Sequence, residues 1–319
     1  MKTASAIILA GGNGERLLPL TRLLVGDDRP KQYCPVVGEE TLLDQTRRRA
    51  AALVTPDRTL IVVTREHEPY YAPALAELPA RNVVEQPVGR GTAPAILYAL
   101  LRLRTVAPGG TVAILPSDHY VDDDAAFMAR VEGAMEVVTA RPDTIVLLGV
   151  EPDRPESQYG WIEPDDVVLG PWSWPVYGVR RFWEKPSEET ARRLMRAGAL
   201  WNSFVIVGKP AVIEHLVCRA LPALADAFGP LRALSGTARE SEAARIAYAR
   251  LDPTDFSRDV LERCPERLAV LPVTGTAWTD LGDPARALAR RAVVQRQLRR
   301  RRTVATAPED RTRAAASAS

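Results

Sequence analysis

Short runs of aliphatic and β-branched residues recur along the first half of the chain, and each run is almost free of polar positions. Such runs are typical of strands buried on both faces of a sheet. Segments of helical length separate them, which is the pattern of β-α-β units and of a mainly parallel sheet. The strands predicted in this way are Ala6–Ala10, Leu60–Thr64, Asn82–Glu85, Val112–Leu115 and Ile145–Gly149.

Two of the intervening helices have recognisable first turns. Thr41 has the spacing of an N-cap residue relative to Asp44, and Thr92 begins a helix with a proline in its first turn. A third helix is predicted from about Asp123 to Thr139. We therefore expect a doubly wound α/β fold.

The pattern changes after residue 150, where Trp- and Pro-rich segments replace the regular alternation. This half is predicted to contain longer strands with irregular connections, and a helical block broken by Pro and Gly. Its predicted strands are Tyr159–Ile162, Val176–Glu184, Asn202–Val207 and Leu268–Val273, and its helices are Glu188–Ala197, capped by Ser187, and Ala211 to about Arg250.

These changes suggest one domain, residues 1–285, built from halves of about 1–150 and 151–285. Residues 286–302 are predicted to form an arginine-rich C-terminal helix. Residues 303–319 are small and polar, and we expect them to be disordered.

Composition excludes several classes of protein. The chain has 319 residues, 46% hydrophobic and 26% charged, as in a folded globular protein. Its three cysteines lie far apart, with only three histidines to accompany them, so neither a disulfide framework nor a zinc site is expected. The N-terminal apolar run is too short for a membrane span and leads into a glycine loop, so no export signal is expected. We expect a cytoplasmic protein without membrane contact.

The net charge of +2 is unevenly distributed. Residues 286–319 hold ten arginines and two acidic residues, a local charge of +8, which leaves −6 for residues 1–285. A basic tail is compatible with nucleic-acid binding, but this one lacks aromatic residues for stacking and any recognisable binding fold. We expect a solvated helix end and no nucleic-acid partner.

The first predicted strand leads into a glycine loop, Leu9–Leu17. Backbone N–H groups of such a loop can surround phosphate oxygens, which makes a nucleotide the natural ligand, although a plain turn would also explain the glycines. A dinucleotide-binding fingerprint would need Gly or Ala at Leu17 and a helix directly after it, where Pro19 interrupts. A P-loop would need Gly-Lys-Ser/Thr, which the loop lacks.

Further motifs follow at spacings that one domain can accommodate. Together with the glycine loop they resemble the sugar-phosphate nucleotidylyltransferases, and in detail their mannose-1-phosphate guanylyltransferase branch, over residues 5–283. The segments that carry the resemblance are Gly11–Leu17 with Pro30–Gln32, Gln86–Ala95, Leu115–His119, Phe182–Pro186, Trp201–Ser203 and Trp278–Gly282.

The resemblance implies a Rossmann-like nucleotidyltransferase fold of the GT-A type. It also implies a reaction in which GTP and mannose 1-phosphate give GDP-mannose and pyrophosphate. Three positions depart from the usual pattern. Gly91 stands where the branch usually has Asn, Phe204 stands where Gly is usual, and the loop before Pro30 is longer. The first two affect fine specificity and not the type of reaction.

Two aspartates are candidate ligands of Mg²⁺. Asp118 ends a predicted buried strand and Asp280 follows another, which places both near the carboxyl edge of the sheet, where α/β proteins bind ligands. Two carboxylates suit Mg²⁺, because substrate phosphates and water complete its coordination shell. The alternative for each is a structural role in a turn.

Arg16 and Lys31 are the candidates for contact with the triphosphate, against the alternative of exposed surface cations. Lys31 is one of only four lysines, and a compact ammonium suits a phosphate oxygen. The candidate catalytic residues are therefore Arg16, Lys31, Asp118 and Asp280. His119 is interpreted as structural, because a phosphate monoester is already a competent nucleophile near neutral pH.

The remaining site residues are assigned with the help of the resemblance. Glu184 and Asn202 are expected to bind sugar hydroxyls, Lys185 the sugar phosphate, and Gln86 with the Gly89–Thr92 backbone the base. The nucleotide-binding candidates are Leu9, Ala10, Gly11, Gly12, Gly14, Arg16, Lys31, Gln86, Gly91, Thr92 and Asp118, and those for the sugar phosphate are Gly160, Glu184, Lys185 and Asn202.

Two alternatives stay open at this point. One is a related enzyme for another sugar or base. The other is a non-catalytic regulatory protein that binds a sugar nucleotide, against which the presence of Lys31, Asp118, Lys185 and Asp280 argues. The sequence leaves the oligomeric state open, a homodimer included.

Overall fold

A computed structural model describes residues 4–170 and 172–305. The strands are β1 (Ala4–Leu9), β2 (Thr59–Thr64), β3 (Val83–Gln86), β4 (Thr111–Pro116), β5 (Tyr120–Val121), β6 (Ile145–Val150), β7 (Gly160–Val168), β8 (Tyr177–Glu184), β9 (Leu200–Gly208), β10 (Leu268–Val273) and β11 (Trp278–Thr279). The α-helices are α1 (Leu18–Val25), α2 (Leu42–Ala50), α3 (Glu68–Ala74), α4 (Thr92–Val106), α5 (Asp124–Ala140), α6 (Glu188–Arg196), α7 (Pro210–Ala220), α8 (Pro222–Ala227), α9 (Gly229–Leu234), α10 (Glu240–Tyr248), α11 (Phe256–Asp259) and α12 (Pro284–Ala305).

Nine strands form one mixed sheet in the order β3-β2-β1-β4-β9-β6-β10-β8-β7. The first four are parallel, and β9 runs antiparallel between β4 and β6. Strand β10 continues parallel to β6, whereas β8 is antiparallel to β10 and to β7. Most strands therefore point in one direction, with β8 and β9 reversed. Strand β7 also pairs with β9, which closes the second half of the sheet into a partly barrel-like curl.

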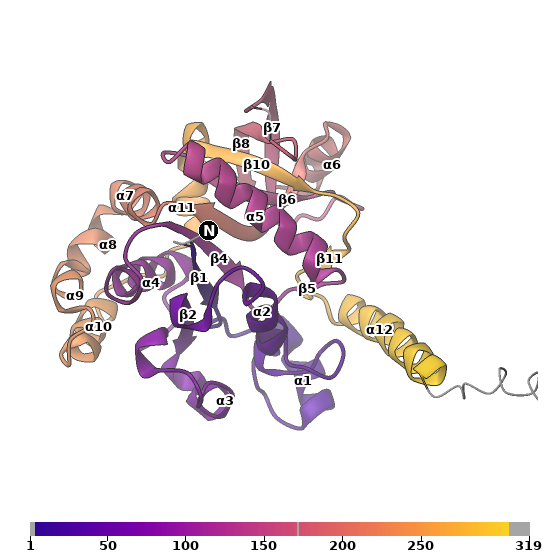
Figure 1. The fold of residues 1–319 in the computed structure, drawn as a ribbon, viewed down its shortest axis with the longest axis horizontal. Coiled ribbons are helices and arrows are strands. Elements are labelled where there is room, and N and C mark those ends of the chain that lie inside the picture. The colour runs from indigo at the N-terminus through magenta and orange to yellow at the C-terminus, as the bar shows by residue number, and fades with distance from the viewer. Residues whose placement is uncertain (1–3, 171, 306–319) are drawn as a thin grey trace, which may run out of the picture.

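Alternate residues of the central strands pack into two separate cores. Ile7 and Val62 belong to the core under α4 and α7–α10, while Ile8 and Val63 belong to the core under α2 and α5. Figure 1 shows α5 crossing one side of the sheet, with α4 and α7–α10 gathered on another side. Because helices cover both faces, apolar residues fill the strands without alternation, as the sequence pattern predicted.

The predicted caps of two helices, Thr41 and Ser187, are confirmed at atomic level. The Thr41 side chain accepts a hydrogen bond from the backbone N–H of Asp44 at the start of α2. Ser187 and Asp123 cap α6 and α5 in the same way. Each cap satisfies a backbone donor that the helix leaves unpaired.

Three elements differ from the prediction. Pro19 lies in the first turn of α1 and does not prevent a helix, because that turn needs no backbone donor there. Strand β7 continues to Val168, beyond the predicted Ile162, as an increasingly exposed ribbon paired with β8, and the run of residues 163–166, without branched aliphatic or aromatic side chains, interrupts its hydrophobic pattern. Helix α12 extends to Ala305, past the predicted Arg302. The predicted disorder of the remaining residues, 306–319, lies outside the described part of the chain.

None of the helices in the described ranges combines the length and apolar character that crossing a lipid bilayer requires.

Candidate active site

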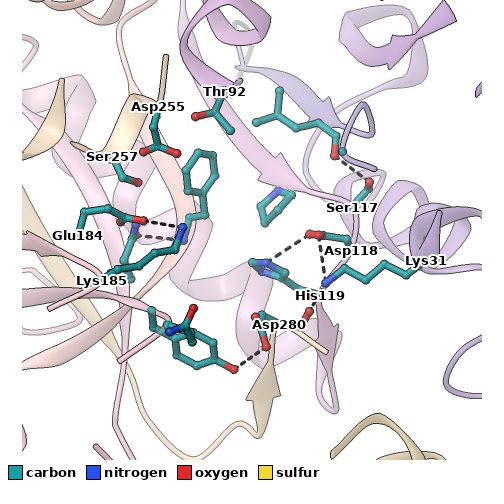
Figure 2. Close-up of a pocket in the computed structure, with 18 of the residues that line it drawn as sticks. Lys31, Thr92, Ser117, Asp118, His119, Glu184, Lys185, Asp255, Ser257 and Asp280 are labelled. Atoms are coloured by element: carbon teal, nitrogen blue, oxygen red, sulfur yellow. Dashed lines mark hydrogen bonds and ion pairs between the residues drawn. The ribbon is translucent and has the colours of Figure 1, made fainter. Parts of the chain in front are cut away.

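A cavity of about 290 Å³ opens where β1 and β4 end and where β7, β8 and β9 contribute the opposite wall. One wall carries the glycine loop, Lys31, Asp118 and Asp280, and the other carries Glu184 and its neighbours. Figure 2 shows the labelled side chains of both walls turned toward the same space. The parallel strands β1 and β4 end at the same edge of the sheet, so residues distant in sequence meet there.

The glycine loop is held by hydrogen bonds to its carbonyl groups. Gln32 Nε2 donates to the carbonyl oxygens of Ala10 at 3.0 Å and Gly12 at 2.7 Å. The hydroxyl groups of Tyr33 and Thr64 donate to those of Ala10 and Gly11, at 2.8 and 2.9 Å. These bonds hold the backbone of residues 10–12 in place beside the cavity.

Lys31 is a buried cation at the centre of the nucleotide-side wall. Its side chain is 7% exposed, and its Nζ lies 3.2 Å from Asp118 Oδ2 and donates to the backbone carbonyl of Asp280. The alternative of a surface cation is therefore wrong for Lys31. Burial opposes ionisation of Asp118, but Lys31 and His119 outweigh it and hold the pKa of Asp118 below its ordinary value.

His119 lies directly beside Asp118 in the same wall. Its Nε2 lies 3.3 Å from Asp118 Oδ1, and its ring packs edge-on against Trp278 with centroids 5.0 Å apart. Burial lowers the pKa of His119 despite the neighbouring carboxylate. An imidazole held in this way fits the structural role expected for it.

Asp280 has one carboxylate oxygen bound by the protein and one turned toward Arg16. Its Oδ1 accepts hydrogen bonds from the Tyr159 hydroxyl at 2.5 Å and from the Gly282 N–H at 2.8 Å. Its Oδ2 lies 3.6 Å from the half-exposed Arg16 guanidinium. Burial opposes ionisation here too, but Lys31 and Tyr159 lower the pKa of Asp280.

The opposite wall combines one acid, one cation and one amide. Lys185 Nζ lies 3.3 Å from Glu184 Oε1, and Asn202 lines the same side. A Cβ atom on Gly160 would lie 3.0 Å from a Glu184 carboxylate oxygen, so a side chain there would require its neighbours to shift by a few tenths of an ångström. Burial and the neighbouring Asp255 raise the pKa of Glu184 above its ordinary value.

Backbone strain is concentrated at this site. Among the described residues, Lys185, Phe204 and Leu281 are the non-glycine residues with positive φ, at 48°, 60° and 51°. Two of them line the cavity, and Leu281 follows Asp280. The left-handed conformation costs an L-residue roughly 1–2 kcal/mol. A glycine at the position of Phe204 would avoid this cost.

Most of the predicted site residues lie together. Those that line the cavity are Leu9, Gly12, Arg16, Lys31, Thr92, Asp118, Gly160, Glu184, Lys185, Asn202 and Asp280. Gly14 lines an adjoining hollow with Arg16 and Lys31.

Four of the predicted residues are not part of the cavity lining. Ala10 is buried beneath the loop, and Gly11 lies against Gln86. Gln86 is itself buried and accepts a hydrogen bond from the Tyr248 hydroxyl at 3.2 Å. Gly91 lies against the backbone of Thr254, where its Cβ would be 2.2 Å from the carbonyl oxygen. Contact of these four with a ligand stays a prediction.

Several residues of the cavity were not predicted as site residues. Gln32 and Trp278 lie within recognised motifs, and Tyr159 directly precedes Gly160, so position alone could have found them. Asp255 and Ser257 lie at the start of α11, in a segment without a recognised motif.

Comparison with known proteins identifies the family of the chain. Residues 5–292 match the family described as nucleotidyl transferase. The chain is 32% identical to the xanthan biosynthesis protein XanB of Xanthomonas campestris pv. campestris, over 89% of this chain and 58% of that protein. It is 30% identical to a mannose-1-phosphate guanylyltransferase of Escherichia coli, over 87% and 57%. The chain thus spans little more than half the length of these curated relatives.

A solved structure from Thermus thermophilus, described as a mannose-1-phosphate geranyltransferase, superimposes with a TM-score of 0.74 and 34% sequence identity. The match covers 88% of this chain and 76% of that one. The family match extends over both walls of the cavity, from the glycine loop to the residues around Asp280. The chain therefore belongs to the nucleotidyl transferase family.

Proposed function

We propose that this chain transfers a nucleotidyl group to a sugar 1-phosphate, with GTP and mannose 1-phosphate as its substrates and GDP-mannose and pyrophosphate as its products. The observation that carries the proposal is the convergence of two walls on one cavity. The glycine loop with Lys31 suits a nucleotide, and Glu184 with Lys185 suits a phosphorylated sugar. The names of the relatives support the choice of base and sugar.

In this reaction an oxygen of the sugar phosphate attacks the α-phosphorus of the nucleotide in line, and pyrophosphate leaves. Both reactants are anions, so the site must offset their repulsion and hold them aligned. Arg16 and Lys31 supply positive charge on the nucleotide side, and Lys185 supplies it on the sugar side. Glu184 and Asn202, which line the same cavity, would orient sugar hydroxyls.

Asp118 and Asp280 are the residues that would hold Mg²⁺. In the described part of the chain no group of three or more His, Cys, Asp or Glu side chains gathers as a metal site. Two carboxylates on the phosphate-binding wall nonetheless fit a cation that shares its shell with substrate phosphates. Such a cation supplies neutralisation of the charge on the phosphoryl oxygens.

Phe204 supports a second candidate, an enzyme for a different sugar or base. The residue lines the cavity at a position where glycine is usual in the mannose-1-phosphate guanylyltransferases that the sequence resembles. A phenyl group adds volume to the wall that contains Asn202, which changes the space left for the sugar's substituents and the hydroxyl groups that can reach a hydrogen-bond partner.

Pyrophosphate release from a matrix of GTP, ATP, UTP and dTTP against the 1-phosphates of mannose, glucose, galactose and N-acetylglucosamine tests the proposal. The highest kcat/KM is expected for GTP with mannose 1-phosphate. A higher value for another pair would select the second candidate. Sugar-nucleotide binding without turnover of any pair would instead indicate a regulatory protein.

A further inference from the structure

One carboxylate oxygen of Asp280 is saturated by protein donors. Oδ1 accepts from the Tyr159 hydroxyl at 2.5 Å and the Gly282 N–H at 2.8 Å. These two bonds fix the plane of the carboxylate and leave Oδ2, on the side of Arg16, as the oxygen available to a cation. The orientation of Asp280 therefore depends on where the Tyr159 hydroxyl is held.

The ring of Tyr159 has little freedom. It is 5% exposed and packs edge-on against Trp201 and Trp278, with centroid distances of 5.0 and 5.6 Å. Packing fixes the ring, and polar partners set only the direction of the O–H bond.

The polar partner behind Tyr159 comes from α12, outside every motif that the sequence shows. Arg286 Nη1 lies 3.4 Å from the Tyr159 hydroxyl and donates to Glu156 Oε2 at 2.8 Å. The backbone N–H of Arg286 is itself bonded to Asp283 Oδ1 in the first turn of the helix. Arg286 thus approaches Tyr159 from a fixed position.

The hydrogen bonds run in one direction, from Arg286 through Tyr159 to Asp280. Arg286 donates to the Tyr159 oxygen, so the hydroxyl hydrogen is free to point at Asp280. Glu156 holds the guanidinium in place and balances its charge. Figure 1 shows α12 leaving the body of the molecule near β5 and β11, so this helix joins the site through its first turn.

We propose that Tyr159 and Arg286 are positioning residues for Asp280, and that the first turn of α12 is therefore part of the active site. The inference rests on the proposed function, because the orientation of Asp280 matters to the reaction only if that carboxylate holds the cation. Replacing a residue that orients a metal ligand commonly lowers metal affinity or activity by about 10–100-fold.

Tyr159→Phe and Arg286→Met test the proposal, with Arg296→Met as the matched control, since Arg296 is an exposed arginine on the same helix. Mn²⁺ binding is measured by electron paramagnetic resonance of the free ion, with a non-hydrolysable GTP analogue present. Both test variants are expected to weaken Mn²⁺ binding by about tenfold and to lower kcat by a similar factor. The KM for mannose 1-phosphate should stay within about twofold, and the control should match the wild type.

Arg286→Lys separates positioning from folding. It keeps a charge beside Glu156 but loses the planar fork, so its Mn²⁺ affinity should lie between those of the wild type and Arg286→Met. If the wild type binds Mn²⁺ and Asp280→Asn abolishes binding while Tyr159→Phe retains wild-type affinity, the positioning role is refuted and the metal assignment stands. If Asp280→Asn leaves Mn²⁺ binding and turnover unchanged, the assignment of Asp280 fails, and the inference fails with it.

Discussion

Gly91 provides a sharp test of the structure, because the proteins that the sequence resembles usually have Asn at this position. Here the residue precedes α4 with φ 85° and ψ −174°, a conformation that is essentially restricted to glycine. A Cβ atom would lie 2.2 Å from the carbonyl oxygen of Thr254, which is too close for any side chain. The backbone around Thr254 therefore lies so close to the loop that only glycine fits at position 91.

The expected cost of Gly91→Ala combines two contributions. Forcing alanine into this conformation costs about 1–3 kcal/mol. Moving Thr254 away also weakens the 3.3 Å hydrogen bond from Ala93 N–H to its carbonyl, worth about 0.5–1.5 kcal/mol. We expect a destabilisation of about 3 kcal/mol, and at about 2 °C per kcal/mol for a domain of this size the Tm should fall by about 6 °C.

Differential scanning calorimetry measures the effect, with Gly89→Ala as the matched control. Gly89 lies in the same loop, has no left-handed φ, and has open space where its Cβ would be. Its substitution should leave the Tm nearly unchanged. Because Asp255 and Ser257 follow Thr254 into the cavity, Gly91→Ala should also raise the KM for the sugar phosphate. A Tm for Gly91→Ala equal to that of the control would refute the reasoning.

Three further predictions follow from individual side chains. Lys31→Arg should lower turnover by at least about tenfold, because a planar guanidinium cannot replace the buried ammonium beside Asp118. Gln86→Ala should change discrimination among GTP, ATP and UTP more than the KM for mannose 1-phosphate, because Gln86 lies against Gly11 of the glycine loop. The raised pKa of Glu184 means that the folded state binds its proton more tightly than the unfolded chain, so this carboxyl costs stability as pH rises above its ordinary pKa. Glu184→Gln should therefore raise the Tm at about pH 7.5, and the gain should vanish near about pH 4.

Each of these predictions has a contrary outcome. Near-normal turnover of Lys31→Arg would show that Lys31 does not contact a phosphate. An equal effect of Gln86→Ala on all three nucleotides would assign Gln86 to the structure of the loop and not to the base. A Tm gain for Glu184→Gln that persists unchanged at low pH would show that the buried charge is not its cause.

The sequence predicted the architecture well where hydrophobic burial determines it. The strands around Ile7, Ile61 and Val146 are buried on both faces, so their apolar runs were unambiguous. Motifs that lie directly after such strands, as Asp118 does after β4, could be placed at the sheet edge from topology alone.

The parts that could not be predicted depend on contacts between distant segments. Tyr159 and Asp280 are 121 positions apart, and Arg286 and Tyr159 are 127 apart, so no local pattern relates them. The close approach of Thr254 to Gly91 has no signature in sequence beyond the glycine itself. Such pairs are set by how the loops pack against one another at the edge of the sheet.

The most direct test of the proposed chemistry is pyrophosphate release from GTP and mannose 1-phosphate by Asp118→Asn, Asp280→Asn and the double variant, as a function of Mg²⁺ concentration. If both carboxylates hold one cation, each single substitution should lower kcat by about a hundredfold or more, and the double variant should fall little further. Melting curves should show that all three variants fold. Fully additive losses, or a single variant with the normal Mg²⁺ dependence, would contradict the shared cation and return at least one aspartate to a structural role.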